Sequence, residues 1–368
     1  MQYMLTVLSF MNFVQIVKAS PFNDFFSGDP VVLNVYSIKQ PPLPNNYFYD
    51  DCSFTNMLSR SVTHSSDVET QIMFENCLFF NCTTFNKRTG GAFYIDIPNG
   101  GCILRRSCAS CCQTENSYQL GYIYTKTESP NSIYFFSFEK CSLDLSGYSI
   151  ALYLCRGTQT INNMNSSKNT GNQQNGFYSS IPSPLMFSFC TVSNINNTNG
   201  FHVSTSSNIG FFRYSNFVNL LSQNTGSYCI YLSGGFIMEY CTIKSWQGYA
   251  IYGSTAVIVR YCCFDSTINQ TFGSFSLSSP YGNTATYIIE HYSTAMCEAQ
   301  NQIHPPQTPM PSATHFDYTQ DHICQTLPPP PTPPQTIQHQ YSINDSNALL
   351  LGSIIRVFTI SMIQLIFN

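Results

Sequence analysis

The residues that could most readily support catalysis are the adjacent acids Asp50 and Asp51. Two carboxyl groups that flank a glycosidic bond can act as general acid and base. The other aspartates considered occur singly, at Asp67, Asp96, Asp144 and Asp265. No serine-hydrolase, phosphate-binding or dinucleotide-binding motif is present. We therefore expect no catalytic residue, and a secreted, pectate-lyase-like carbohydrate-active enzyme is the alternative.

The 16 cysteines could bind a metal or form disulfides. Cys108-x-x-Cys111-Cys112 has the spacing of half a zinc site, but no second pair of Cys or His completes it. We therefore expect no metal and no cofactor. Cysteines that recur once per repeat are expected inside as stacked thiols, although the sequence leaves their redox state open. The better disulfide candidates are Cys82, Cys102, Cys111, Cys112 and Cys263.

The composition is that of a folded chain with a polar but largely uncharged surface. Hydrophobic residues make up 43% and charged residues only 9%, and Tyr (24) and Phe (29) are abundant. The net charge is −4, and Lys and Arg form no basic stripe. Nucleic acid is therefore not an expected partner.

A short pattern recurs along the chain: apolar, any, apolar, any, any, Cys. Copies end at Cys77, Cys141, Cys190, Cys241 and Cys262, and weaker ones lie between them. Many of the spacings are close to about 25 residues, which is typical of a solenoid repeat. One degenerate copy is expected near residue 165, and the polar run 162–175 is expected to be a loop inserted into that coil.

A glycine followed by a short β-rich run comes after most copies. In each run small or apolar residues alternate with Tyr or polar residues, which is typical of a strand buried on one face. We expect the glycine to permit a positive-φ bend before the strand. Such glycines are Gly91, Gly121, Gly147, Gly226 and Gly248.

These repeats predict an all-β protein, because short strands with turns cannot bury an apolar face alone but stacked repeats can. The predicted fold is a right-handed parallel β-helix solenoid of about ten coils over residues 45–300. A leucine-rich repeat is the competing solenoid. Its apolar positions should be mostly Leu, whereas Phe, Ile, Val, Met and Tyr fill them here.

Tyrosines at the outward positions of these strands could line up into a binding face. Tyr has a broad apolar ring and a hydroxyl group, which suits contact with a glycan or a protein. Filling of the core by the same rings is an equal alternative. The candidate binding residues are Tyr94, Tyr124, Tyr153, Tyr231 and Tyr252.

The N-terminus is typical of a secretory signal peptide over residues 1–19, with cleavage after Ala19. A buried first strand or helix is the alternative. Residues 20–44 are expected to form an N-terminal cap region. Five Asn-x-Ser/Thr sequons make glycosylation candidates of Asn81, Asn165, Asn196, Asn269 and Asn344.

The C-terminal part divides into two expected segments. Half of the 20 prolines lie within residues 301–347, which predicts an extended stalk of polyproline type. A ligand for proline-recognition modules is the alternative. Residues 348–368 are apolar enough to predict a transmembrane helix despite Arg356. A cleaved lipid-anchor signal and a tail that spans nothing stay open.

One segment of the chain resembles a known family. Phe79-Phe80-Asn81-Cys82, followed by Gly90-Gly91-Ala92-Phe93-Tyr94-Ile95, is similar to the paired motifs of the polymorphic outer-membrane-protein repeats. That family carries its repeats on a right-handed β-helix of pectin-lyase-like type. Similar proteins with a signal peptide, a β-helix and one C-terminal span occur on the surfaces of parasitic protists.

The resemblance implies a cell-surface adhesion or coat role. The family's Gly-Gly-Ala motif occurs once here, and no copy of its Phe-x-x-Asn motif stands in register. The C-terminal autotransporter barrel of the bacterial members does not carry over. We expect a membrane-tethered, non-catalytic protein at the cell surface, with an extracellular protein or glycan ligand. A secreted protein is the alternative localisation.

Overall fold

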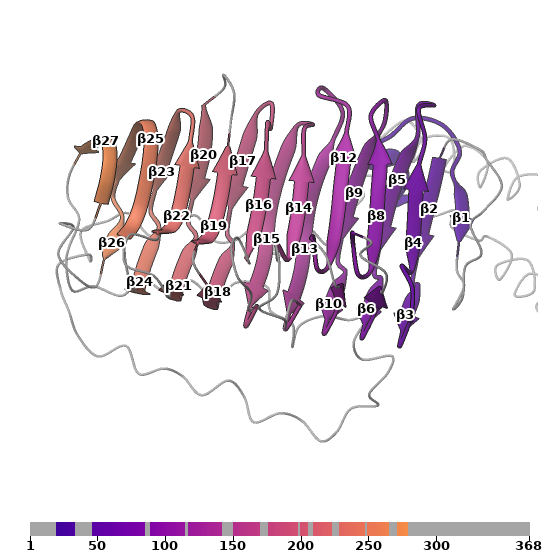
Figure 1. Ribbon diagram of the computed structural model, residues 1–368. Helices are drawn as coiled ribbons and strands as arrows, with labels where there is room; N and C mark the ends of the chain where they lie inside the picture. Colours follow the sequence, from indigo (N-terminus) through magenta and orange to yellow (C-terminus); the bar gives the residue numbers. More distant parts are fainter. Residues whose placement is uncertain are drawn as a thin grey trace, which may run out of the picture. The chain divides into compact units, whose positions relative to one another are not determined.

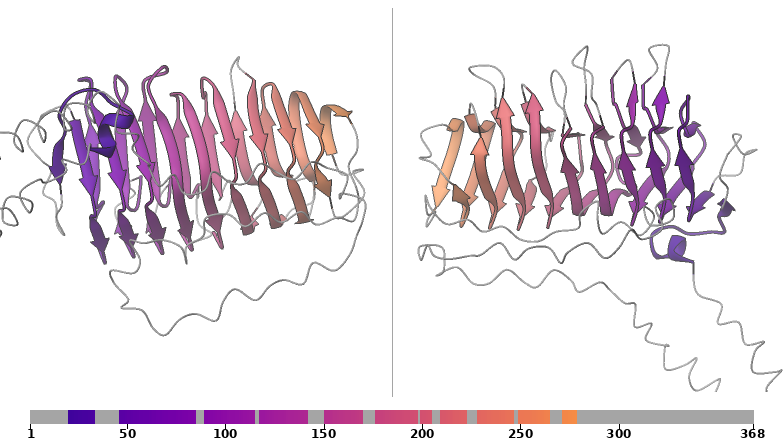
Figure 2. Two further views of the ribbon diagram at one scale, coloured as in Figure 1. Left: turned by 180° about the vertical axis from the view of Figure 1, so that it is seen from behind. Right: turned by 90° about the horizontal axis from the view of Figure 1, so that it is seen from below.

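The computed structural model describes residues 20–33, 46–84, 89–114, 117–141, 150–169, 176–197, 199–204, 209–222, 228–246, 249–264 and 271–278. Within these ranges the chain is an all-β parallel solenoid with no α-helix (Figure 1). Strands that lie far apart in the sequence run side by side along its length (Figure 2). The prediction of a parallel solenoid is therefore confirmed.

Three faces make up the solenoid, and each is a stack of parallel strands. The first face consists of β1 (Val31–Leu33), β2 (Asn46–Asp50), β5 (Gln71–Glu75), β9 (Gly101–Arg105), the first parts of β13 (Asn131–Glu139) and β15 (Gln159–Ser167), β17 (Leu185–Ser188), β20 (Gly210–Arg213), β23 (Phe236–Glu239), and the last parts of β25 (Tyr249–Arg260) and β27 (Thr271–Ser278).

The second face consists of β3 (Ser53–Thr55), β6 (Leu78–Phe80), β10 (Cys108–Ser110), the last parts of β13 and β15, β18 (Thr191–Asn197), β21 (Asn216–Ser222), β24 (Thr242–Trp246) and β26 (Cys263–Phe264). The third face consists of β4 (Val62–Ser65), β8 (Phe93–Ile97), β12 (Gly121–Thr125), β14 (Leu152–Cys155), β16 (Phe177–Ser180), β19 (Asn199–Ser204), β22 (Tyr228–Ser233) and the first parts of β25 and β27. A short pair, β7 (Thr83–Thr84) and β11 (Gln113–Thr114), stands apart.

The described residues form about six turns, each with a separate strand on each of the three faces. The prediction of about ten coils was therefore wrong. Strands β13, β15 and β25 are long and take part in two faces each, so their turns do not divide into three strands. The run 162–175, expected to be an inserted loop, is another correction, because its residues 162–167 belong to β15. Their polar side chains are satisfied by neighbouring coils, as where the Asn165 amide donates to Ser137 Oγ at 2.9 Å.

Residues in the left-handed region bend the chain at two corners of each coil. At the first corner, between the first and second faces, these residues are Asp51, Asn76, Arg106, Phe135, Asn163, Phe189, Tyr214, Tyr240 and Tyr261, with φ between 47° and 56°. At the second corner, after the second face, they are Asn56, Asn81, Cys111, Lys140, Lys168, Asn194 and Asn219. A positive φ is uncommon for residues other than Gly, so its recurrence at equivalent positions marks a requirement of the coil.

The recurring cysteine follows the left-handed residue and closes the corner. The thiol of Cys77 donates to the carbonyl of Glu75 at 3.3 Å and to that of Tyr49, in the preceding coil, at 3.4 Å. Cys190 repeats this arrangement with Ser188 and Ile161. These carbonyls face the bend, where an inward donor satisfies them. The cysteines that end the five clear copies of the pattern are thus buried thiols, as expected, whereas Cys108, which ends a weaker copy, is disulfide-bonded.

The cysteines occupy both corners rather than a single column. Cys77, Cys190, Cys241 and Cys262 lie at the first corner, whereas Cys82, Cys112 and Cys141 lie at the second. Of the five expected disulfide candidates, four are thiols, namely Cys82, Cys102, Cys111 and Cys112. The reason is that Cys82 and Cys112 point inward side by side from successive parallel coils, as the first-corner cysteines do.

Aromatic rings fill the interior. Phe187 is 1% exposed and packs against Phe177, Phe201, Phe212 and Phe217 at centroid distances of 5.1 to 6.2 Å. Each ring comes from a neighbouring strand, so the core is continuous along the solenoid. Burial of large rings in every coil supplies the main favourable free energy of the fold.

Two of the five glycines expected to permit a bend, Gly91 and Gly121, have another role, and the other three, Gly147, Gly226 and Gly248, lie outside the described residues. Gly121 does not have a positive φ, and a Cβ there would lie 2.0 Å from the Phe93 ring of the preceding coil. A Cβ on Gly91 would lie 2.3 Å from the Gln119 carbonyl oxygen. These two glycines therefore permit close packing between coils rather than a bend.

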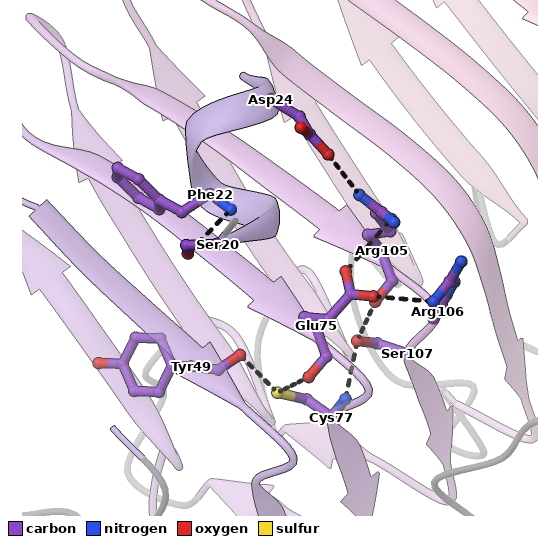
Figure 3. Close-up of polar contacts among 9 residues, drawn as sticks. All are labelled: Ser20, Phe22, Asp24, Tyr49, Glu75, Cys77, Arg105, Arg106 and Ser107. Carbon is purple, nitrogen blue, oxygen red and sulfur yellow. Dashed lines mark hydrogen bonds and ion pairs between the residues drawn. The ribbon is translucent and has the colours of Figure 1, made fainter. Parts of the chain in front are cut away.

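The N-terminal segment lies against the outside of the first face. A short 3-10 helix, η1 (Pro21–Asp24), begins at Ser20, whose Oγ accepts the backbone N–H of Phe22 at 3.3 Å (Figure 3). Phe22 and Phe26 cover the outward side chains of Phe48, Met73 and Ile103. The expected signal peptide, stalk and transmembrane segment lie outside the described residues. No helix within the described ranges is long and apolar enough to cross a bilayer.

Candidate functional site: an aromatic row on the third face

The third face presents alternate side chains to solvent. In β8 Phe93, Ile95 and Ile97 are buried, whereas Tyr94 and Asp96 between them are partly exposed. Strand β12 repeats this alternation with Tyr122 and Tyr124 as its partly exposed residues. Because the strands are parallel and in register, outward residues at equivalent positions form rows along the solenoid axis.

One of these rows is almost entirely aromatic, and we call it the tyrosine row. The strand register places its members opposite one another in successive strands. The centroid distances between consecutive rings are 5.0, 5.4, 4.9, 4.3, 4.2 and 5.1 Å. Its members are Tyr94, Tyr122, Tyr153, Tyr178, His202, Tyr231 and Tyr252.

The stacking determines which part of each ring meets solvent. Interplanar angles are only 13° between Tyr94 and Tyr122 and 13° between Tyr231 and Tyr252. The three steps from Tyr153 to Tyr231 are tilted by 45° to 52°. Neighbouring rings therefore cover one another's faces at the two ends of the row, which there presents ring edges and phenol groups. Such a surface can donate and accept hydrogen bonds along its length while its apolar edges exclude water.

A second outward row lies two residues further along the same strands. It consists of Ser65, Asp96, Tyr124, Cys155, Ser180, Ser204 and Ser233. The Tyr94 hydroxyl donates to Asp96 Oδ2 at 3.3 Å. The Tyr94 phenol is thus oriented toward this second row.

Charges gather at the N-terminal end of this face. The Arg60 guanidinium lies 4.5 Å from the Tyr94 ring centroid, and that of Arg156 lies 4.8 Å from the Tyr124 ring centroid. Among the described residues of the two rows, the acid near these arginines is Asp96. From Tyr178 to Tyr252 the described residues of the two rows are uncharged side chains or histidine.

The ionisable groups of the row are held neutral. Burial lowers the pKa of His202 to about 4, so its imidazole is uncharged at neutral pH. Burial also raises the pKa of the Tyr122, Tyr153 and Tyr178 phenols above the usual tyrosine value. Burial likewise raises the pKa of the neighbouring Cys155 thiol, which is therefore not an activated nucleophile.

Four of the five tyrosines expected in a binding face lie in the row: Tyr94, Tyr153, Tyr231 and Tyr252. Tyr124 does not, since its register partners are Asp96 and Cys155. Sequence reasoning missed Tyr122, Tyr178 and His202. The alternation in Gly121-Tyr122-Ile123-Tyr124 marks both tyrosines as outward, but only the inter-strand register selects Tyr122.

The expected glycosylation sites fall in different environments. Asn81 is exposed at the second corner, where its amide donates to Asn56 Oδ1 at 2.7 Å. Asn165 is only 8% exposed, and a glycan there would have to displace its bond to Ser137. Asn196 belongs to β18. Asn269 and Asn344 lie outside the described residues.

The adjacent acids considered for catalysis, Asp50 and Asp51, lie near Glu75. Glu75 belongs to a buried ion-pair network, which Figure 3 shows. Glu75 Oε2 is 3.3 Å from Arg105 Nε, and Glu75 Oε1 is 3.6 Å from an Arg106 nitrogen. Arg105 also contacts Asp24 of η1 at 3.5 Å. Burial raises the pKa of Glu75 to about 7 despite the two arginines, with Asp50 and Asp51 adding to the rise.

Glu75 has the raised pKa of a general acid, but its carboxyl group is not open to a substrate. The Glu75 side chain is 3% exposed, and η1 lies above its partner Arg105. Asp50 pairs in register with Glu75 at the first corner, rather than across an open cleft. Its position matches a structural ion pair that holds η1 against the solenoid.

No cluster of three or more His, Cys, Asp or Glu side chains suited to a metal occurs in the described ranges. Comparisons of the chain with protein-family models, curated proteins and solved structures gave no match.

Proposed function

We propose that this chain is a non-catalytic cell-surface protein that binds an extracellular protein or glycan through the tyrosine row. The observation that carries this proposal is the continuity of the row over seven successive third-face strands, β8 to β25. Partly exposed, pre-stacked aromatic side chains lose little conformational entropy when a partner covers them. Such side chains are the ones that most often anchor protein interfaces.

The proposed setting is a tethered ectodomain. Residues 1–19 would direct secretion, residues 301–347 would form the stalk, and residues 348–368 would anchor the chain in the membrane. The pectin-lyase-like resemblance and the adhesion role belong to the same proposal. The alternative, a secreted carbohydrate-active enzyme, lacks a supporting observation, since Glu75 is buried and paired.

Protease treatment of intact cells tests the setting. An epitope tag inserted between Asp67 and Val68, in the exposed turn after β4, should be lost while the cells stay sealed. A tag that is protected in cells, or recovered from the medium, would overturn the anchored surface location.

Adhesion of the tagged cells tests the binding role. Cells that express the chain should attach to extracellular matrix layers more than cells that express Tyr153→Ala, because that change removes the third of the row's seven rings. Equal attachment by both cell lines at equal surface expression would count against the row as the binding site.

A further inference from the structure

The spacing of the tyrosine row restricts the ligand that can lie along it. Parallel strands are about 4.8 Å apart, so six steps from Tyr94 to Tyr252 span about 29 Å. A ligand parallel to the solenoid axis meets one ring edge at every step. Only a ligand whose own repeat matches one or two steps can make equivalent contacts along the whole row.

The electrostatics of the row restrict the ligand further. The titratable groups that face it are the phenols, His202, Cys155, Arg60, Asp96 and Arg156, and the charged ones lie at its N-terminal end. Beyond Tyr153 the second row contributes Ser180, Ser204 and Ser233. Beyond Tyr153 a charged ligand would lose hydration without gaining an ion pair, so this longer part of the row favours an uncharged partner.

Two peptide conformations can be compared with this spacing. An extended β-strand presents same-face side chains about 6.6 Å apart, which does not match one or two strand steps. A polyproline II helix repeats every three residues, or about 9.3 Å. Two strand steps are about 9.6 Å, so the mismatch stays below about 1 Å over the whole row.

Resting on the proposed function, we propose that the tyrosine row binds an uncharged, proline-rich peptide segment of a partner protein in the polyproline II conformation, parallel to the solenoid axis. Such a helix has no internal hydrogen bonds, so its carbonyl groups can accept from phenol groups. Its proline rings pack against aromatic edges, and its rigidity lowers the entropy lost on binding.

Fluorescence anisotropy of a labelled decaproline tests the inference with the full chain purified in detergent. Ten residues in this conformation are about 31 Å long, close to the row itself. Tyr153→Ala should weaken decaproline binding by about tenfold, as for a central interface residue. Tyr240→Ala is the matched control, because Tyr240 also stacks between two tyrosines, at 5.0 and 5.2 Å, but at the first corner. It should change binding less than about twofold.

Three comparison ligands decide the outcome: a flexible Gly-Ser decamer, an alternating Val-Thr decamer and an uncharged β-linked glucose hexamer. Preferential binding of decaproline, with the difference between the two variants, supports the inference. Preferential binding of the glucose hexamer or of the Val-Thr peptide overturns it, as does the absence of decaproline binding while circular dichroism shows a folded chain. Row-dependent cell adhesion would still support the proposed function in those cases, so the two failures are distinguishable.

Discussion

The imidazole of His202 lies between the phenol rings of Tyr178 and Tyr231, at centroid distances of 4.3 and 4.2 Å. It occupies a position that tyrosine fills in the strands on either side. The ring thus continues the row, tilted by 47° and 52° against its two neighbours, and is the only titratable nitrogen base among the row's members. Its pKa of about 4 follows from burial among uncharged rings.

Replacing His202 with Phe should reduce the sensitivity of the fold to mild acid. The folded-state pKa of about 4 lies below the ordinary value of 6.5, so the unfolded chain binds the extra proton between these pH values. Stability contributed by neutral His202 is complete above pH 6.5 and falls as pH decreases toward 4. Between pH 7 and 5 the wild-type chain should lose about 2 kcal/mol from this residue alone.

Urea unfolding at both pH values measures that loss for the wild type and for His202→Phe. His64, whose pKa is also lowered to about 4 by burial, contributes to both chains and cancels in the comparison. An equal loss in the two chains would mean that His202 is not held neutral by the stack.

Phe187→Ala should be among the most damaging single changes in the core. Its ring is surrounded by four other phenylalanine rings, and its loss leaves a cavity that neighbouring coils cannot close. The expected cost is about 3–5 kcal/mol in the free energy of unfolding. Ile209→Ala, at a side chain 53% exposed, should cost less than about 0.5 kcal/mol. Similar urea midpoints for the two variants would contradict this account of the core.

Much of the architecture could be predicted because local patterns repeat once per coil. The alternation around Tyr94 and Tyr122 marked third-face strands, and the Cys pattern marked a corner. The degenerate copy expected near residue 165 corresponds to Asn163 and Met164. Asn163 has the positive φ of the first corner, and Met164 occupies the position that a cysteine fills in the clear copies. Each of these patterns involves only a few consecutive residues, so it can be recognised in one sequence without knowledge of the contacts between coils.

The remainder depends on contacts between coils, which local patterns do not encode. Tyr214 and Tyr240 have φ of 49° and 54°, conformations that are rare for aromatic residues. Their rings stack at 5.0 Å, and only the neighbouring coil makes that contact possible. For the same reason Tyr124 and Tyr122 were indistinguishable until the register of β12 against β8 was known.

Ile181→Asn should stabilise the chain. Ile181 has a φ of 51° and is 41% exposed, so a β-branched residue is strained there without the compensation of deep burial. Arg156 occupies the equivalent position one coil earlier with a φ of 61°, because Cys155, which precedes Arg156, pairs in register with Ser180, which precedes Ile181. Because Asn tolerates this conformation, we expect a gain of about 1 kcal/mol.

Differential scanning calorimetry can measure the gain as a rise in melting temperature. Ile209→Asn, at an exposed residue without a positive φ, is the control and should leave the melting temperature nearly unchanged. A lower melting temperature for Ile181→Asn would show that the isoleucine side chain makes contacts worth more than the backbone strain.

Alkylation should separate the cysteines of the folded chain by their position in the coil. Cys77, Cys112 and Cys190 are buried, and burial raises the pKa of each thiol, so almost no reactive thiolate is present at pH 8. Cys111 is partly exposed because it occupies a left-handed second-corner position that turns its side chain outward. Brief treatment with iodoacetamide followed by peptide mass spectrometry should therefore modify Cys111 well before the other three, and denaturant should remove the difference. Rapid modification of Cys77 or Cys190 without denaturant would contradict the inward, carbonyl-bonded thiols that close each corner.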